Sequence, residues 1–221
     1  MNGNTAIIVA LPREVAALVN GWERRDLSRS VRVWRRGNVV VACAGIGSAR
    51  VSLACDAAMT LGPVATLVSA GVAGACDPKL HAGDVVQGAT VIDARTGERF
   101  EAANMGAAAI VTAAAIVSVK EKARLRETYG ASAVDMEAAT VFRIAQAHGL
   151  QCRAIKAISD EAEFAMEGLE RFVTHDGQFR QSAFAAYAAI RPHMWGRVMA
   201  LGRNTARAVR ALTEALGAEI D

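Results

Sequence analysis

Short apolar runs alternate with amphipathic segments along most of the chain, and this alternation limits the folds open to it more than any other feature. The continuous apolar runs at residues 6–11 and 64–69 indicate buried strands, because strands covered on both faces are apolar throughout. Residues 138–148 show helical periodicity instead and end at Gly149, a good C-cap residue. Strands alternating with helices predict an α/β three-layer sandwich.

A hairpin adds antiparallel pairing to this plan. Residues 31–34 and 39–44 flank Arg36-Gly37-Asn38, so we expect a mixed central sheet. The pattern predicts three more strands, at 85–93, 110–117 and 153–158. It also predicts four more helical segments: from Pro12, at 48–61 and 120–129, and over the tail from about residue 179, interrupted near Pro192 and Gly196. Without a repeat, linker or low-complexity stretch, residues 1–221 predict a single domain.

Composition narrows the class of protein. The chain is 52% hydrophobic and 5% aromatic with a net charge of +3, and it lacks the interleaved basic and aromatic residues of a nucleic-acid surface. Four well-separated cysteines form no C-x-x-C pair and indicate buried free thiols: Cys43, Cys55, Cys76 and Cys152. No signal peptide or membrane span is evident, so the expected location is cytoplasmic.

Carboxylates stand at the junctions between apolar strands and helices. Ala-Val-Asp-Met-Glu-Ala-Ala occupies residues 133–139, and Ala-Ile-Ser-Asp occupies residues 157–160. Charge at a buried strand end usually has a polar partner or a ligand. Ligands of open α/β sheets bind beyond the carboxyl ends of the strands. Together the two motifs predict a small-molecule site that grips hydroxyl groups and handles a proton.

Three glycine-rich turns are expected after strands, two at residues 44–48 and 69–74 and a weaker one at Gly83. Such turns let backbone N–H groups approach an anion or a sugar closely. The first is no dinucleotide fingerprint, because G-x-G-x-x-G requires glycine where Arg50 stands. With the two carboxylate motifs, the first two turns give four strand ends that could converge on one cleft.

These motifs, with Ala-Ile-Ile-Val-Ala-Leu-Pro-Arg-Glu-Val at residues 6–15, resemble the nucleoside phosphorylase and nucleosidase superfamily, type 1. The opening segment is most similar to 5′-methylthioadenosine/S-adenosylhomocysteine nucleosidases. Residues 120–137 and the tail resemble the hopanoid-associated branch, which is thought to remove adenine from a nucleoside attached to a triterpenoid lipid. The resemblance implies hydrolysis of a purine nucleoside with a 5′ substituent, such as adenosylhopane, by a homo-oligomer that needs no metal or organic cofactor.

The resemblance also implies roles for particular residues. Asp160, aided by Ser159, would protonate or hydrogen-bond N7 of the purine, which requires a carboxyl kept protonated by an apolar wall or a partner. Glu137 would accept hydrogen bonds from the ribose hydroxyls, Met136 would pack on the ribose, and Glu14 would activate water. Three residues would line the site near the nucleophile: Ser69, Ala70 and Gly71.

Structural roles are the alternatives for the same residues. Asp160 could cap a following helix, Glu137 could be a favourable first-turn carboxylate, and Asp135 is expected to be a helix cap rather than a catalytic group. Glu14 could face solvent, and Met136 could be plain core. The four histidines have no spacing suggestive of metal ligation.

One position departs from the nucleosidase pattern. Where those enzymes carry Gly-Asp-Ala-Phe, with the Phe beside the base, this chain reads Val-Lys-Glu-Lys and ends at Lys122. Phe164 is the candidate to cover the base in its place. The segment at residues 93–101 is short, so the 5′ side of the pocket is expected to be open.

Three further alternatives stay open. Phosphorolysis would use Arg13 and Arg50 beside the predicted turns to hold phosphate. A nucleoside-binding module without turnover would keep the ribose grip alone. The basic, apolar tail could contact a membrane surface, although packing on the sheet or on a second subunit would explain it too.

Overall fold

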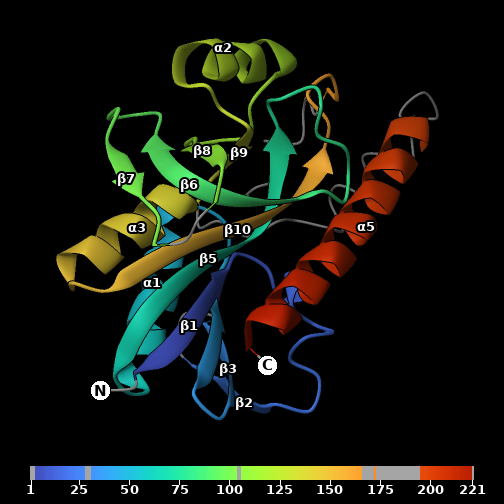
Figure 1. The fold of residues 1–221 in the computed structure, drawn as a ribbon. Helices are drawn as coiled ribbons and strands as arrows, with labels where there is room; N and C mark the ends of the chain where they lie inside the picture. Colours follow the sequence, from blue (N-terminus) through green and yellow to red (C-terminus); the bar gives the residue numbers. More distant parts are fainter. Residues whose placement is uncertain (1–2, 28–30, 104–105, 166–171, 173–194, 221) are drawn as a thin grey trace.

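A mixed β-sheet runs through the centre of the protein (Figure 1). The computed structural model describes residues 3–27, 31–103, 106–165, 172 and 195–220. Within that part of the chain, ten strands form one sheet: β1 (Asn4–Val9), β2 (Glu23–Asp26), β3 (Arg32–Arg36), β4 (Val39–Cys43), β5 (Val64–Ala75), β6 (Val85–Asp93), β7 (Arg99–Glu101), β8 (Ala108–Thr112), β9 (Ala133–Asp135) and β10 (Gln151–Asp160). The helices are the short 3-10 helix η1 (Pro12–Glu14), α1 (Ser48–Thr60), α2 (Val119–Tyr129), α3 (Ala138–Ala147) and α5 (Trp195–Ile220).

Part of the sheet closes on itself. The strand order is β10-β6-β8-β9-β5-β1-β4-β3-β2, and β10 also pairs with β5. Strands β5, β10, β6, β8 and β9 therefore form a ring, while β1, β4, β3 and β2 extend it as an open sheet. The long parallel ladder of β5 and β10 joins the two parts, and β1 and β4 run parallel to it.

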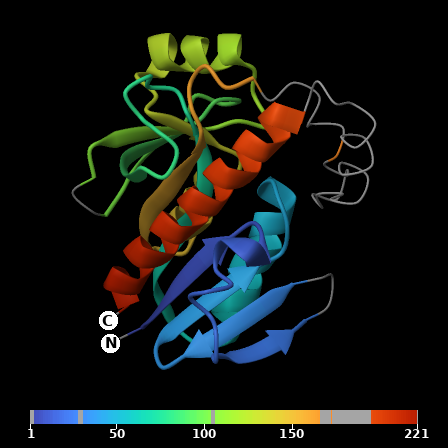
Figure 2. The same ribbon diagram turned by 90° about the vertical axis from the view of Figure 1, so that its right-hand side faces the viewer.

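Helices lie on both faces of the central strands β1, β5 and β10 (Figure 2). The apolar faces of α1 and α3 pack on one side against residues such as Ile8, Leu67 and Ile158. Helix α5 crosses the other side, where Ala208, Leu212 and Leu216 are fully buried. An ion pair between Arg153 on β10 and Glu219 also ties α5 to the sheet.

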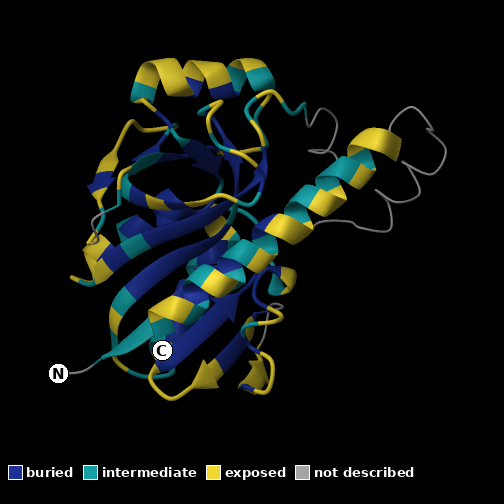
Figure 3. Ribbon diagram, turned by 45° about the vertical axis from the view of Figure 1, so that its right-hand side comes forward, coloured by how far each residue is buried: buried dark blue, intermediate teal, exposed yellow. Residues whose placement is uncertain are grey.

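The arrangement confirms the predicted three-layer sandwich with a mixed sheet. Strands β3 and β4 form the predicted hairpin, and α1, α2 and α3 lie within two residues of their expected bounds. Figure 3 shows the central strands as buried, whereas α2 and β2 carry many exposed residues. The four cysteines are free and buried, as expected.

Three expectations about local structure were wrong. The helix expected from Pro12 is only a 3-10 turn, followed by turns to Gly21, and the strands β2 and β7 were not predicted. The stretch 113–117 lies beyond the end of β8, so it is loop rather than strand. The tail is helical over α5, which continues through Gly196, where an interruption was predicted. Residues 179–194 of the predicted segment lie outside the described residues.

The predicted glycine turn at residues 69–74 was also wrong, because β5 continues through it to Ala75. The two glycines serve close approach instead of a turn. Gly71 has φ 141°, and a Cβ there would lie 3.3 Å from Glu14 Oε1. At Gly74 a Cβ would lie 2.8 Å from Asp160 Oδ2. Strand β5 therefore has no side chain at the two positions where the carboxyl groups of Glu14 and Asp160 lie against it.

Among the described residues, none of the helices is long and apolar enough to cross a membrane.

Candidate active site

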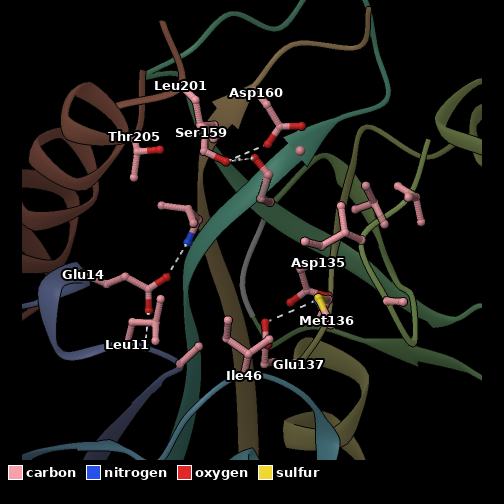
Figure 4. Close-up of a pocket in the computed structure, with 18 of the residues that line it drawn as sticks. Leu11, Glu14, Ile46, Asp135, Met136, Glu137, Ser159, Asp160, Leu201 and Thr205 are labelled. Atoms are coloured by element: carbon pink, nitrogen blue, oxygen red, sulfur yellow. Dashed lines mark hydrogen bonds between the residues drawn. The ribbon is translucent and has the colours of Figure 1, made fainter. Parts of the chain in front are cut away.

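A cavity of about 190 Å³ opens where β1, β4, β9 and β10 end, beside the last residues of β5. Figure 4 shows its lining side chains. They come from segments far apart in the sequence: Ala10, Leu11, Arg13, Glu14, Ile46, Val72, Ala73, Gly74, Ala115, Ile116, Val117, Lys122, Val134, Asp135, Met136, Glu137, Ser159, Asp160, Leu201 and Thr205. Most of these residues are apolar, so the carboxyl groups, Arg13 and Lys122 stand out as its chemistry.

One end of the cavity holds a buried ion pair. Asp160, the last residue of β10, accepts a hydrogen bond from Lys122 Nζ at 2.5 Å through Oδ2 and one from Ser159 Oγ at 2.8 Å through Oδ1. The Lys122 ammonium also donates to the Glu161 carbonyl at 2.8 Å. Both partners are almost fully buried, with side chains 2% and 6% exposed. Of the two expected surroundings of Asp160, an apolar wall or a partner such as Ser159, the structure has the Ser159 contact, and it adds a cation.

The local sequence explains how Lys122 reaches this point. Helix α2 begins after Ser118, whose Oγ accepts the Glu121 N–H in an N-cap bond. Lys122 and Leu125 lie one turn apart and are the buried residues of this otherwise polar helix. The buried face of α2 thus carries one aliphatic side chain, Leu125, and one ammonium group, that of Lys122.

Glu14 lines the cavity from η1 and does not face solvent. Its Oε2 accepts the Leu11 N–H at 2.8 Å, and its Oε1 accepts the Val72 N–H at 3.3 Å. Burial raises the pKa of Glu14 above its usual value, although these two hydrogen bonds and the charge of Lys156 act in the opposite direction. A carboxyl group tuned upward in this way is suited to take up a proton.

Glu137 stands at the N-terminus of α3. Its Oε1 accepts the Gly47 N–H at 2.9 Å, which ties α3 to the glycine turn after β4. Its Oε2 accepts the Met136 N–H at 3.3 Å. Burial, and then the negative charge of Asp135, raise the pKa of Glu137 to about 7. The group can therefore change charge near neutral pH.

A second buried ion pair lies beneath Glu137. Lys156 Nζ lies 2.8 Å from Asp135 Oδ2, and both side chains are fully buried. The Asp135 carboxylate also accepts the Thr112 hydroxyl at 2.7 Å and the Ala138 N–H at 2.9 Å. Asp135 thus caps the start of α3, as predicted. The charges of Asp135 and Glu137 raise the pKa of Lys156, although burial opposes them.

Five of the predicted site residues line the cavity together: Glu14, Met136, Glu137, Ser159 and Asp160. Three others do not line it: Ser69, Ala70 and Gly71. Because β5 continues past them, the cavity meets the strand at Val72, Ala73 and Gly74 instead. Ser69 is buried, and its hydroxyl has no hydrogen-bond partner among the described residues.

Sequence reasoning missed the two buried lysines. Lys122 was noted only as a replacement for an aromatic residue, and Lys156 was not singled out. A lysine inside the apolar run of β10 was the available signal for Lys156, because lysine is rarely buried without a partner. Phe164 is not among the lining residues. Among the described residues, no group of His, Cys, Asp and Glu side chains is placed to hold a metal ion.

The fold and the cavity define a class: a mixed α/β protein with a cavity at its strand ends. The model of the phosphorylase superfamily matches residues 4–116 and 106–190, more than half of the sequence. The protein belongs to the phosphorylase superfamily. No curated protein matches the chain.

Solved structures share the fold at low sequence identity. A 5′-methylthioadenosine/S-adenosylhomocysteine nucleosidase of Helicobacter pylori is 17% identical, with 99% of this chain and 98% of that one covered and a TM-score of 0.73. The corresponding nucleosidase of Neisseria meningitidis is 18% identical over 97% of each chain, with a TM-score of 0.71. Futalosine hydrolase of Helicobacter pylori is 17% identical over 97% and 96% of the chains, with a TM-score of 0.70.

Proposed function

We propose that the protein cleaves the N-glycosidic bond of a purine nucleoside and transfers the sugar to water. One observation carries this proposal: Glu14, Glu137 and Asp160 come from three different strand ends and line one largely aliphatic cavity. The solved relatives named above, whose titles describe nucleosidases and a hydrolase, support it through the shared fold.

The reaction explains why the cavity needs carboxyl groups at both ends. As the bond from C1′ to N9 breaks, positive charge develops on the sugar and negative charge on the base. In the proposed pose Glu137 accepts the ribose hydroxyls and Met136 lies against the sugar, so the negative form of Glu137 stabilises the sugar cation. The base lies at the opposite end, against Asp160 and Ser159, where it acquires a proton as it leaves.

Glu14 is the proposed base that activates water. The two backbone N–H groups of Leu11 and Val72 hold its carboxylate in a fixed orientation. Each carboxylate oxygen accepts more than one hydrogen bond, so a water molecule in the cavity can still donate to it. The raised pKa of Glu14 strengthens it as a base for that proton.

Water is favoured over phosphate as the nucleophile by the placement of the arginines. Arg50 donates to the Ala44 carbonyl at 2.5 Å and is not among the lining residues, whereas Arg13 lines the cavity beside Glu14. A phosphate held by Arg13 alone would lie against the Glu14 carboxylate, which repels it. Phosphorolysis remains the second candidate reaction.

The experiment measures base release from adenosine and 5′-substituted adenosines, each with and without phosphate. Hydrolysis predicts release that is independent of phosphate, and phosphorolysis predicts release only with phosphate. Asp160→Asn should lower kcat/KM by about 10²-fold or more, whereas Asp56→Asn on the exposed face of α1 should leave it unchanged. Retained nucleoside binding without any release by the wild-type protein would support a binding module instead.

We further propose that the base is adenine and that the 5′ substituent is an apolar, lipid-linked group, as in adenosylhopane. The aliphatic lining supports an apolar substituent. Trp195 and Met199 are exposed, 49% and 57%, four residues apart on α5, which supports a peripheral membrane contact of that helix. Co-sedimentation with anionic liposomes tests this contact, and a protein that stays in the supernatant would contradict it.

A further inference from the structure

Lys122 holds a proton at the end of the cavity where the leaving base would lie. Its ammonium group carries three N–H donors. Among the described residues it has two acceptors, Asp160 Oδ2 at 2.5 Å and the Glu161 carbonyl at 2.8 Å. Because Lys122 also lines the cavity, the third N–H is available to a ligand.

The neighbouring groups cannot supply this proton. Both carboxyl oxygens of Asp160 accept hydrogen bonds, from Lys122 and Ser159, so neither oxygen directs a proton into the cavity. The Ser159 hydroxyl has two acceptors within the protein, Asp160 Oδ1 at 2.8 Å and the Ala73 carbonyl at 3.3 Å, so its proton is not directed into the cavity. Arg13 lies beside Glu14, and a guanidinium group does not give up its proton in proteins. Among the described lining residues at this end, Lys122 is the acid.

Burial of the Lys122–Asp160 ion pair costs solvation free energy. Two charges removed from water lose several kcal/mol of solvation each, by order of magnitude, and a buried pair is often no more stable than apolar residues of the same volume. The position lies on an otherwise polar helix, where the ammonium group could have faced solvent. The Lys122 side chain points inward instead and lies against β5 at Gly74, a position without a side chain.

We propose that Lys122 is a catalytic residue that donates the proton to the leaving purine at N7. This inference rests on the proposed function and goes beyond it by naming the acid. The bond from C1′ to N9 breaks and its electron pair goes to the base. N7 takes a proton from Lys122 Nζ, which becomes a neutral amine beside the Asp160 carboxylate.

The charges in the site balance through the reaction. Water adds to C1′ and gives its proton to Glu14, so one proton enters at Glu14 and one leaves at Lys122. The base departs neutral, and solvent returns the proton from Glu14 to Lys122 after product release. Asp160 is then the group that keeps Lys122 charged and aimed at N7 before each turnover.

The test compares two leaving groups on the same sugar. Adenine requires protonation to leave, whereas 4-nitrophenolate from 4-nitrophenyl β-D-ribofuranoside leaves without it. Lys122→Met should lower kcat/KM for adenosine by about 10²- to 10⁴-fold and change it little for the nitrophenyl riboside. Lys156→Met is the matched control, because it breaks the other buried Lys–Asp pair, beside Glu137 and remote from the base end. It should affect both substrates equally.

Equal losses on both substrates in Lys122→Met would overturn the inference, since they would indicate a structural role. If Lys122→Met fails to fold, Lys122→Arg replaces it. Arginine keeps a positive partner for Asp160 but releases no proton, so the same loss confined to adenosine is expected. A wild-type protein that cleaves neither of these substrates nor any 5′-substituted adenosine would refute the proposed function itself, and the inference with it.

Binding provides a second measurement that does not need the nitrophenyl substrate. Adenine has an acceptor at N7, whereas 7-deazaadenine has a C–H group there. The wild-type protein should bind adenine about tenfold more tightly than 7-deazaadenine, and Lys122→Met should bind both alike, because a hydrogen bond to a charged donor contributes about 1.5–3 kcal/mol. Preference for adenine that survives in Lys122→Met would contradict the contact.

Discussion

Replacing Glu137 by Gln should make the protein more stable than wild type by a margin that grows as pH rises toward neutrality. Burial and the charge of Asp135 raise the pKa of this carboxyl from 4.5 to about 7. Between those two pH values the folded protein holds a proton that the unfolded chain has released. The free energy of unfolding therefore falls as pH rises through this window. At 1.36 kcal/mol for each unit of pKa, the loss is about 3 kcal/mol.

Glutamine removes the ionisation and keeps the carbonyl oxygen that accepts the Gly47 N–H. The wild-type and variant proteins should therefore be compared by urea unfolding in a series from about pH 4 to about pH 8. The stability of the variant relative to wild type should rise by about 3 kcal/mol across the series. Glu127→Gln, an exposed change on α2, is the control and should show no such rise.

A constant difference between the two proteins over the whole series would refute this reasoning. It would mean that the positive charge of Lys156, which lowers the pKa of Glu137, balances burial and the repulsion from Asp135. Glu137 would then be a permanent carboxylate at neutral pH, and nucleoside affinity should not change as pH passes 7.

Two further predictions concern the close contacts of the site. Gly74→Ala would place a Cβ 2.8 Å from Asp160 Oδ2, so kcat/KM should fall by about 10²-fold while the protein stays folded. The control is Gly88→Ala, which crowds aliphatic side chains only and should retain activity. Equal activity of the two variants would contradict the prediction, because it would show that the contact at Gly74 relaxes freely. Lys156→Met leaves the Asp135 carboxylate buried without its cation and should lower the free energy of unfolding by about 3–5 kcal/mol, as measured by urea unfolding. Adding Asp135→Asn should recover part of that loss. A double variant that recovers none of it would contradict the pairing.

The local fold was largely predictable because its signals are local. The β3–β4 hairpin follows from a glycine between two apolar runs, and α3 follows from its periodicity and Gly149. The strand β2 has no such signal, because all four of its residues are exposed and charged. It forms by pairing with the edge of β3. This contact is tertiary, so the strand propensities of its own residues do not predict it.

The glycines of β5 show where local reasoning fails. The sequence over residues 69–74 has the composition of a turn, yet the strand continues because β10 pairs with it throughout. Glycine is needed there to admit Glu14 and Asp160, which are distant in the sequence. The closure of β5, β10, β6, β8 and β9 into a ring is equally non-local, so periodicity alone did not predict it.

The candidate site was predictable to the extent that its residues stand at strand ends. Asp160, Glu137 and Glu14 were singled out from motifs and resemblance, and they line one cavity. Lys122 was not predicted as a partner, because a lysine on a polar helix is expected to face solvent. Only the tertiary packing of α2 against the end of β10 turns it inward.

The closed ring of strands also has a consequence for the order of folding. Ala73 on β5 and Ser159 on β10 lie 86 positions apart in the sequence and are joined by a hydrogen bond in the fold. Contacts of such high sequence separation require the closure of a long loop and slow the folding of a domain. On the ribosome, β1, β4 and β5 can pair early, but β5 must wait for β10 to be synthesised. A nascent chain that stops before β10 therefore has no cavity, and it exposes one edge of β5 to other chains.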